Sequence, residues 1–197
     1  MEIDLVAHCG ASTKGEFVCT LDATDIASGW TECRAIRNKA RTYTMDAMKN
    51  IMNHLPFPLK GIDSDNGSEF INHHFLFFCK EHDLCFTRSR ANHANDSCYV
   101  EQKNWSVVRK AIGYGRFEGQ ESVDLLNQFY KLHALVNNFF MPSQKLLDRQ
   151  RQGSRVIKKH DLPLSPYRRL MQDPGILPDV KQALRLTFSC KTQSAES

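Results

Sequence analysis

Three acidic residues, spread over the first half of the chain, could together support metal-dependent chemistry. Asp4 lies inside a segment in which apolar and polar residues alternate, a pattern typical of a β-strand, where aspartate is disfavoured. Asp65 ends a second such segment, just before a turn at Asn66-Gly67. Glu101 lies in a segment with helical spacing. Carboxylates that a fold brings together repel each other unless they are protonated or share a cation, so the three predict a cation site.

The ligand types indicate which cation would bind. Oxygen ligands suit Mg²⁺ or Mn²⁺ and do not suit zinc. Two such ions side by side are a standard device for phosphodiester chemistry, in which one activates the attacking oxygen and the other stabilises the leaving oxygen. Taken singly, each acid is also explained as a surface residue, and the turn at Asn66-Gly67 alone accounts for Asp65. The combination of the three acids is what favours a site.

The spacing of apolar residues predicts the elements that hold these acids. Strands are predicted over residues 1–8, 16–24, 30–36, 59–65 and 84–88. Helices are predicted over 44–54, from a cap at Ser68 along a stripe that contains Ile71, Phe75, Phe78 and Cys79, from a cap at Asp96 or Ser97 to Ile112, and over 121–140. The order of these elements predicts an α/β fold, in which a mixed five-stranded sheet is flanked by helices.

The helix that carries Glu101 is expected to pack on this sheet. Its apolar stripe consists of Val100, Val107 and Ala111, with Asn104 and Val108 beside it. Glu101 stands at the shoulder of the stripe, so its carboxylate should reach the edge of the sheet. Lys103 and Lys110 are expected to point to the opposite side.

Four short motifs, in the same order and spacing, resemble those of a known family. They are Glu2-Ile3-Asp4, Thr24-Asp25-Ile26-Ala27-Ser28-Gly29-Trp30, Asp63-Ser64-Asp65-Asn66-Gly67-Ser68-Glu69-Phe70 and Tyr99-Val100-Glu101-Gln102-Lys103-Asn104. They are similar to the catalytic core of bacterial insertion-sequence transposases and retroviral-type integrases, the DDE type. Thirty-five residues lie between Asp65 and Glu101, the separation that names the acidic triad of this family. The resemblance covers residues 1–140.

The resemblance implies a ribonuclease-H-like fold and an enzyme that cuts and joins DNA. It makes Asp4, Asp65 and Glu101 the catalytic residues and the ligands of two Mg²⁺ or Mn²⁺ ions. It implies DNA, both element ends and target, as the partner, and a homo-oligomer as the active form. Asn104 would lie beside the site and is a candidate DNA contact. Lys103, Arg109 and Lys110 are candidate DNA contacts too, although solvated cations on a helix surface explain these three at least as well.

Two departures from the family pattern leave alternatives open. Family members usually carry an N-terminal helix-turn-helix region, and only three residues precede Asp4 here. A truncated, inactive remnant that binds DNA without cutting it is therefore one alternative, and a nuclease of the same fold that only hydrolyses is another. Asp63 shares a strand face with Asp65 and adds negative charge near the expected metals, but nothing assigns it as a ligand.

The remainder of the chain is basic. Between Lys145 and Arg169 there are eight Lys or Arg residues and two Asp residues, within a total of 197 residues whose net charge is +4. Residues 141–197, which proline punctuates, are expected to form a less regular basic extension with a role in DNA binding, after a catalytic core of residues 1–140. Arg155, Lys158 and Lys159 are candidate contacts to the DNA backbone, and a solvated charge run is the alternative.

Other site types and locations are less well supported. His74, Cys79, His82 and Cys85 match no familiar zinc spacing, and His8 with Cys9 lacks a third group to orient a nucleophile. The odd number of cysteines, seven, indicates reduced thiols. No apolar run of about 18 residues and no secretory signal is evident, so a membrane partner is not expected. We expect a cytoplasmic protein that is associated with the bacterial nucleoid.

Overall fold

The strand that carries Asp4 lies at the centre of a five-stranded sheet. The computed structural model describes residues 1–65, 67, 70, 72–89 and 98–193. Strands β1 (Glu2–Ala7), β2 (Cys19–Thr24), β3 (Thr31–Ile36), β4 (Gly61–Ser64) and β5 (Cys85–Arg88) occur in the order β3-β2-β1-β4-β5. β1 pairs antiparallel with β2 and parallel with β4, and the remaining pairs are β2 with β3, antiparallel, and β4 with β5, parallel. The prediction of a mixed five-stranded sheet is confirmed.

The chain divides into two compact units, Met1–Ala134 and Leu135–Ser197, and the sheet belongs to the first. The functional division after residue 140, into a catalytic core and a DNA-binding extension, stays a prediction. Among the helices of the described residues, none is long and apolar enough to cross a membrane.

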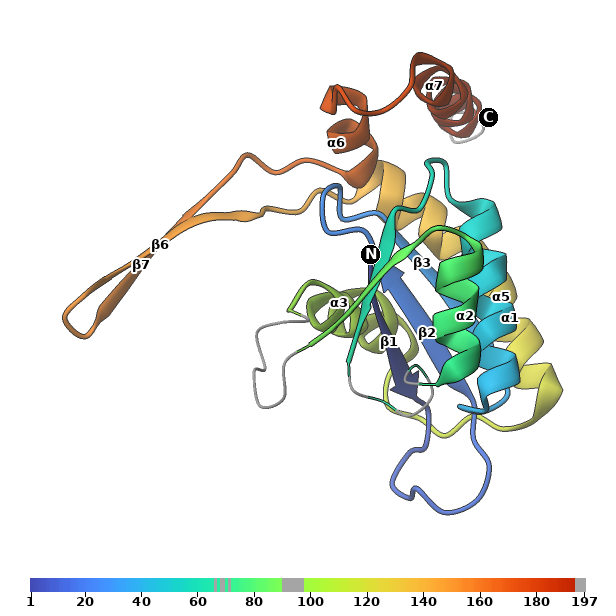
Figure 1. The fold of residues 1–197 in the computed structure, drawn as a ribbon. Coiled ribbons are helices and arrows are strands. Elements are labelled where there is room, and N and C mark those ends of the chain that lie inside the picture. Colours follow the sequence, from blue (N-terminus) through green and yellow to red (C-terminus); the bar gives the residue numbers. More distant parts are fainter. Residues whose placement is uncertain (66, 68–69, 71, 90–97, 194–197) are drawn as a thin grey trace. The chain divides into compact units, whose positions relative to one another are not determined.

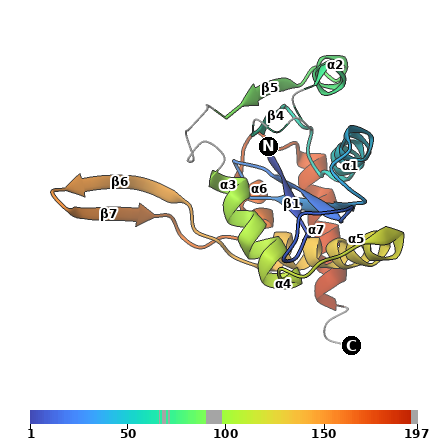
Figure 2. The same ribbon diagram turned by 90° about the horizontal axis from the view of Figure 1, so that it is seen from below.

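Both faces of the sheet are covered by helices (Figures 1 and 2). On one face, Ile3 and Leu21 pack with α1 (Arg41–His54) and α2 (His73–Glu81), which contribute Met48, Ile51 and Phe75. On the other face a second cluster contains residues of β1 and β3, Val18 just before β2, and residues of the helix after Cys98 and of α5 (Gly119–Leu135); its buried members are Val6, Val18, Cys33, Ala35, Val107, Val108, Val123, Leu126 and Tyr130. The alternation in β1 therefore sends Ile3 and Val6 to opposite clusters.

The helix that carries Glu101 departs from regular α-geometry. It consists of α3 (Cys98–Lys103), a π-helical segment η1 (Asn104–Arg109) and α4 (Lys110–Ile112). Val100, Val107 and Val108 are buried as expected, but Ala111 is exposed, and Ile112 packs against the second cluster in its place. A π-helical turn contains about one residue more than an α-helical turn, which moves the buried position from 111 to 112. The prediction of Ala111 in the apolar stripe was wrong for this reason.

The starts of two predicted helices fall in part outside the described residues. Ser68, Ile71, Asp96 and Ser97 are among the residues that the structure does not describe. The N-cap of α2 is Asn72, whose side-chain oxygen accepts a hydrogen bond from the Phe75 N–H at 2.9 Å. The apolar residues Phe75, Phe78 and Cys79 are buried against the sheet as predicted.

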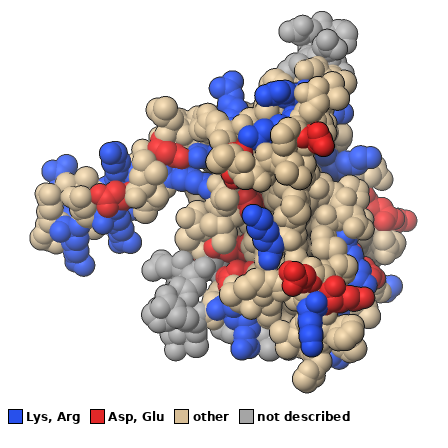
Figure 3. Space-filling model, turned by 45° about the horizontal axis from the view of Figure 1, so that its top comes forward, with Lys and Arg blue, Asp and Glu red and all other residues tan. Residues whose placement is uncertain are grey.

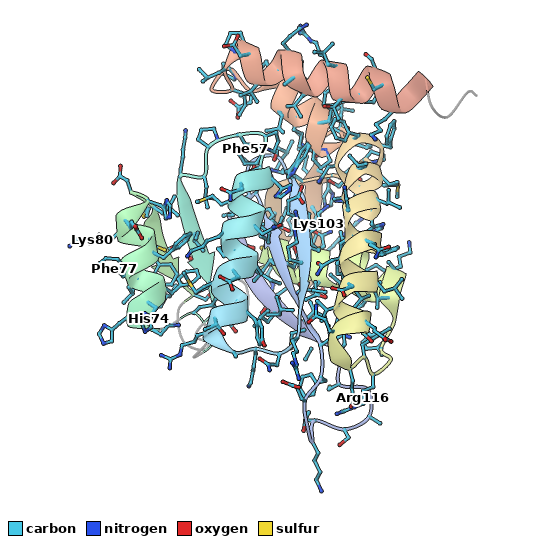
Figure 4. All side chains as sticks on the ribbon, turned by 90° about the vertical axis from the view of Figure 1, so that its right-hand side faces the viewer. Phe57, His74, Phe77, Lys80, Lys103 and Arg116 are labelled. Carbon is cyan, nitrogen blue, oxygen red and sulfur yellow. The ribbon has the colours of Figure 1, made fainter. Side chains whose placement is uncertain are left out.

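Arg116 fastens the segment between β1 and β2. Its guanidinium donates hydrogen bonds to the backbone carbonyls of Cys9, Ser12, Lys14 and Glu16, at distances of 2.7 to 3.3 Å. Figure 4 shows Arg116 beside this segment. One cation thus satisfies four carbonyl groups at the end of the sheet.

The second unit is more regular than predicted. It contains η2 (Val136–Phe140), the hairpin of β6 (Leu146–Gln152) and β7 (Arg155–His160), α6 (Pro166–Gln172) and α7 (Pro178–Gln193). Phe139, Phe140, Tyr167 and Phe188 form an aromatic cluster within it. Arg169 forms a salt bridge to Asp161 and donates to the Ser143 carbonyl, so it holds together the two chain segments at the base of the hairpin. The expectation of a less regular extension was wrong for this hairpin. Both of its faces are exposed and carry charged residues, so its sequence lacks the alternation of apolar and polar residues that indicates a strand.

Candidate active site

Asp4 is held in place by two hydrogen bonds and lies within reach of other negative charges. Its Oδ2 accepts from Asn104 Nδ2 at 2.6 Å, and its Oδ1 accepts from the Leu5 N–H at 2.7 Å. Burial, with smaller contributions from the charges of Asp65 and Glu101, raises the pKa of Asp4 to about 6, whereas the two hydrogen bonds oppose the shift. Asp4 therefore interacts electrostatically with both of the acids that the sequence grouped with it.

The positions of those two acids follow from the elements that carry them. Asp65 is half-buried and follows β4 directly, which lies parallel to β1 in the sheet. Its Oδ1 accepts from the Gly67 N–H at 2.9 Å. Glu101 is exposed on α3. Among the residues with a described position, no three His, Cys, Asp or Glu side chains are gathered closely enough to hold a metal ion, so the ligand set stays a prediction.

The residues present nevertheless fit a divalent cation. The donor set is all oxygen, which suits Mg²⁺ or Mn²⁺, and a cation would relieve the repulsion by Asp65 and Glu101 that adds to the effect of burial on the Asp4 pKa. Asn104 adds a further oxygen. Its Oδ1 is buried and finds no hydrogen-bond partner among the described residues, so this oxygen has unused bonding capacity beside Asp4.

A residue that sequence reasoning passed over, Glu2, anchors the helix of Glu101. The Glu2 side chain is buried, and its Oε2 accepts from the Val100 N–H at 2.8 Å. Burial raises the pKa of Glu2, and hydrogen bonds from the backbone of Val100 and Tyr99 lower it. Glu2 and Asp4 lie on the same face of β1, two residues apart. Strand β1 thus holds α3 by its first turn and η1 by Asn104.

A second unpredicted acid, Asp22, lies opposite Asp4 on β2. It is fully buried; its Oδ1 accepts from Thr24 Oγ1 at 3.2 Å, and its Oδ2 has no partner among the described residues. Burial raises the pKa of Asp22 to about 8, and the charge of Asp4 contributes, whereas the Thr24 bond and the positive charge of Lys103 lower it. A protonated carboxyl at neutral pH avoids a second buried negative charge beside Asp4.

The sequence predicts that Lys103 points away from the sheet, but the structure contradicts this prediction. It is half-buried, and its charge acts on Asp22 in β2 and on Cys33 in β3 (Figure 4 labels Lys103). The π-helical segment that begins at Asn104 departs from the regular helical geometry on which that prediction rests. Its assignment as a DNA contact stays a prediction.

The other two cations of this helix have local partners. Arg109 donates to the Ala7 carbonyl at 2.8 Å and lies over the Tyr114 ring, 4.9 Å from its centroid. Lys110 is exposed, 6.0 Å from the centroid of the Trp105 ring, which is itself 58% exposed. Arg109 therefore ties the helix to β1, and Lys110 is the more accessible of the two. Both remain predicted DNA contacts.

The remaining predicted residues lie in other settings. Asp63 accepts a hydrogen bond from Thr87 Oγ1 on the neighbouring strand β5, which gives it a structural role. Arg155, Lys158 and Lys159 lie on β7 of the second unit, where all three are exposed. A hollow of about 400 Å³ between α1 and α2 is lined by residues that include Met45, His74 and Phe77, and contains none of the three predicted metal ligands.

Residues 1–94 match the family model described as the integrase core domain. All five strands of the sheet, with Asp4 and Asp65, lie within this matched stretch. The chain is 43% identical over 169 residues to the uncharacterized protein y4rM of Sinorhizobium fredii (strain NBRC 101917 / NGR234), covering 86% of this chain and 48% of the relative. The chain thus spans about half the length of this curated relative.

Solved structures with the same fold are retroviral integrases. The catalytic core domain of BIV integrase is similar with a TM-score of 0.54 and 15% identity, over 85% of this chain and 90% of that one. A chain of the simian T-cell lymphotropic virus intasome in complex with PP2A regulatory subunit B56 gamma is similar with a TM-score of 0.58 and 14% identity, over 90% of this chain and 55% of that one. The fold is therefore ribonuclease-H-like, as the resemblance implied.

Only one of the two missed acids of the integrase core had a usable sequence signal. Glu2 alternates with Asp4, so it had to face the same helix, and an unpaired helix start favours a carboxylate. Asp22 carried no such signal, because its importance depends on the register of β2 against β1.

We expect Glu2→Ala to lower the free energy of unfolding by about 1–3 kcal/mol, since it leaves backbone N–H groups at the start of α3 without an acceptor. Glu2→Gln keeps an acceptor at the same position and should cost much less. Urea unfolding gives both values, and hydrogen exchange should show faster exchange at Val100 in Glu2→Ala alone. Equal losses in the two variants would contradict the anchoring role.

Asp22→Asn should stabilise the protein increasingly as the pH rises. The folded pKa of Asp22, about 8, lies above its unfolded pKa of about 4. The contribution of Asp22 to stability is therefore complete below about pH 4 and is lost progressively as the pH rises to about 8. Asn cannot ionise, so the gap in unfolding free energy should widen by up to about 1.4 kcal/mol per pH unit across this window. Urea unfolding at several pH values measures it, and a constant gap would contradict the assigned pKa.

Proposed function

We propose that this integrase core is a metal-dependent polynucleotidyl transferase that cleaves DNA ends and joins them to a target. The observation that carries the proposal is the electrostatic coupling of Asp4 to Asp65 and Glu101, in a chain with an integrase core domain. Carboxylates whose negative charges repel one another form a cluster that favours a divalent cation. The likeness to an intasome chain supports DNA as the partner and a homo-oligomer as the active form.

In this proposal, Asp4, Asp65 and Glu101 hold the cations. Bound Mg²⁺ or Mn²⁺ supplies activation of the attacking oxygen and stabilisation of the leaving oxygen. Asn104 orients the Asp4 carboxylate through the 2.6 Å bond to Oδ2. Glu2 fixes the turn that precedes Glu101. The attacking group is water for cleavage of a DNA end and a DNA 3′-hydroxyl for strand transfer.

Cations outside the acidic centre bind the phosphates. A polyanion approaches a cluster of carboxylates only where positive charge offsets the repulsion. We propose that Lys103, Arg109 and Lys110 on the helix of Glu101 serve this purpose near the acids, and that Lys158 does so on the second unit. Arg155 and Lys159 lie on the other face of the β6–β7 hairpin, so their role as DNA contacts stays a prediction from the sequence. Lys110 is the most exposed of the first three.

Glu101→Gln should lower DNA cleavage and joining at least about 100-fold, because it removes one ligand charge at nearly constant shape. Glu121→Gln is the matched control: Glu121 is also an exposed helical glutamate, in the first turn of α5, and its variant should keep full activity. The assay is incubation of labelled element-end duplex and supercoiled plasmid with Mn²⁺, with products separated on gels.

The products distinguish the candidate functions. Joined products support the polynucleotidyl transferase, nicks alone support a hydrolytic nuclease of the same fold, and retention of DNA without cleavage supports an inactive binding protein. Full activity in Glu101→Gln would overturn the assignment of the site.

Metal binding should also be visible without DNA. A cation that binds only the folded state raises the melting temperature, and binding requires ionised Asp4, whose pKa is about 6. We expect Mn²⁺ at about 100 times its dissociation constant to stabilise the protein by about 2.7 kcal/mol at pH 7.5, with a smaller effect at pH 5.5. Differential scanning fluorimetry measures the shift. The same shift in Asp4→Asn would refute binding at this site.

A further inference from the structure

The β6–β7 hairpin has two faces with different charge patterns. Its strands are joined by the two-residue turn Gly153-Ser154, in which Gly153 has a φ of 62°, and Gln152 pairs with Arg155 across the turn. Every residue of both strands is exposed. Figure 3 shows Lys and Arg side chains projecting along the hairpin. Side chains opposite each other in the register share a face, so the register assigns each cation to one side.

The first face, here called the cationic face, carries Arg149, Arg151 and Lys158. Arg149 lies directly opposite Lys158, and Arg151 lies opposite Val156. No acidic residue belongs to this face. The second face, the mixed face, carries Lys159 opposite Asp148 and Arg155 opposite Gln152. Of the three hairpin cations nominated from sequence, Lys158 therefore lies on the cationic face and the other two on the mixed face.

The Arg149–Lys158 pair is unfavourable in the isolated hairpin. Like charges directly opposite each other on a sheet destabilise it, and a two-stranded ribbon without a packed face is marginally stable to begin with. On the mixed face the charge of Lys159 already has Asp148 opposite it. An external polyanion would therefore gain more on the cationic face, where it removes a repulsion.

We propose that the cationic face of the β6–β7 hairpin binds the phosphate backbone of duplex DNA, with Arg149 and Lys158 as its central pair. This rests on the proposed function, for which DNA is the substrate, and it assigns a role to Arg149 and Arg151. Arg149 and Arg151 are two residues apart on one strand, a spacing of roughly 6.8 Å, so the face presents its three cations as a compact group. A two-stranded ribbon also has the dimensions that a DNA major groove admits.

The test compares two double variants of the full chain that are matched in residue type. Arg149→Gln with Lys158→Gln removes one Arg and one Lys from the cationic face, and Arg155→Gln with Lys159→Gln removes one Arg and one Lys from the mixed face. Binding of a fluorescein-labelled duplex is measured by fluorescence anisotropy over a series of KCl concentrations, with EDTA present. Because no metal is available, cleavage does not contribute, and failure of the catalytic proposal would leave this result unaffected.

We expect the cationic-face variant to weaken binding at least about 10-fold at low salt. It should also reduce the slope of log K against log salt by roughly 2, since each lost phosphate contact removes about 0.9. The mixed-face variant should change the slope by less than about 0.5. Circular dichroism and melting temperature should stay the same in both, because all four side chains are exposed.

Three results would overturn the proposal. One is an equal or larger loss in the mixed-face variant, which would make the hairpin an undirected charge run. Another is a salt dependence of DNA binding that is the same in the wild type and in the cationic-face variant. The third is equal competition by polyglutamate of matched charge, which would show a site for acidic protein segments in place of DNA.

Discussion

Strand β1 and the helix after Cys98 are joined by two carboxylates, and the candidate site depends on that joint. Glu2 accepts the N–H of Val100 in the first turn of α3, and Asp4 accepts the amide of Asn104 at the start of η1. Two attachment points, about a turn of helix apart, fix both the height and the rotation of the helix against the strand. Glu101 and Lys103 lie between these points in the sequence, so their approach to the sheet is set by hydrogen bonds to a neighbouring strand.

The same arrangement concentrates carboxyl groups on one face of the sheet. Asp4 and Asp22 lie opposite each other, and burial raises the pKa of each carboxyl. Each acid responds differently. Asp22, with a pKa of about 8, stays protonated at neutral pH, whereas Asp4, with a pKa of about 6, ionises close to it. Asp4 is thus the carboxylate that becomes available to a cation near pH 7. The positive charge of Lys103 lowers the pKa of Asp22, which burial raises.

Sequence reasoning found those features that depend on local periodicity. Alternation placed Asp4 mid-strand and sent Ile3 to the opposite face, and helical spacing placed Val100, Val107 and Val108 against the sheet. It failed where a long-range contact decides. Ala111 is exposed because a π-helical segment shifts the helix by one position. Lys103 faces inward, where its charge acts on Asp22, a residue 81 positions earlier; the place of Asp22 depends on the register of β2 against β1. The hairpin of β6 and β7 was missed because both of its faces are polar.

The acidic groups around β1 and the basic groups of the β6–β7 hairpin differ in how far they are buried. Around β1 in the first unit, Asp22 is buried and Asp4 is half-buried; protonation limits the negative charge at Asp22, and hydrogen bonds stabilise it at Asp4. In the hairpin of the second unit positive charge is fully exposed, and water and salt screen it. Screening weakens the repulsion between Arg149 and Lys158 in the free protein. Because both side chains are exposed, replacing the surrounding water and ions by phosphates costs little desolvation free energy. Cations on an exposed ribbon therefore suit binding along a DNA backbone irrespective of sequence, whereas the half-buried acids suit chemistry at one phosphate.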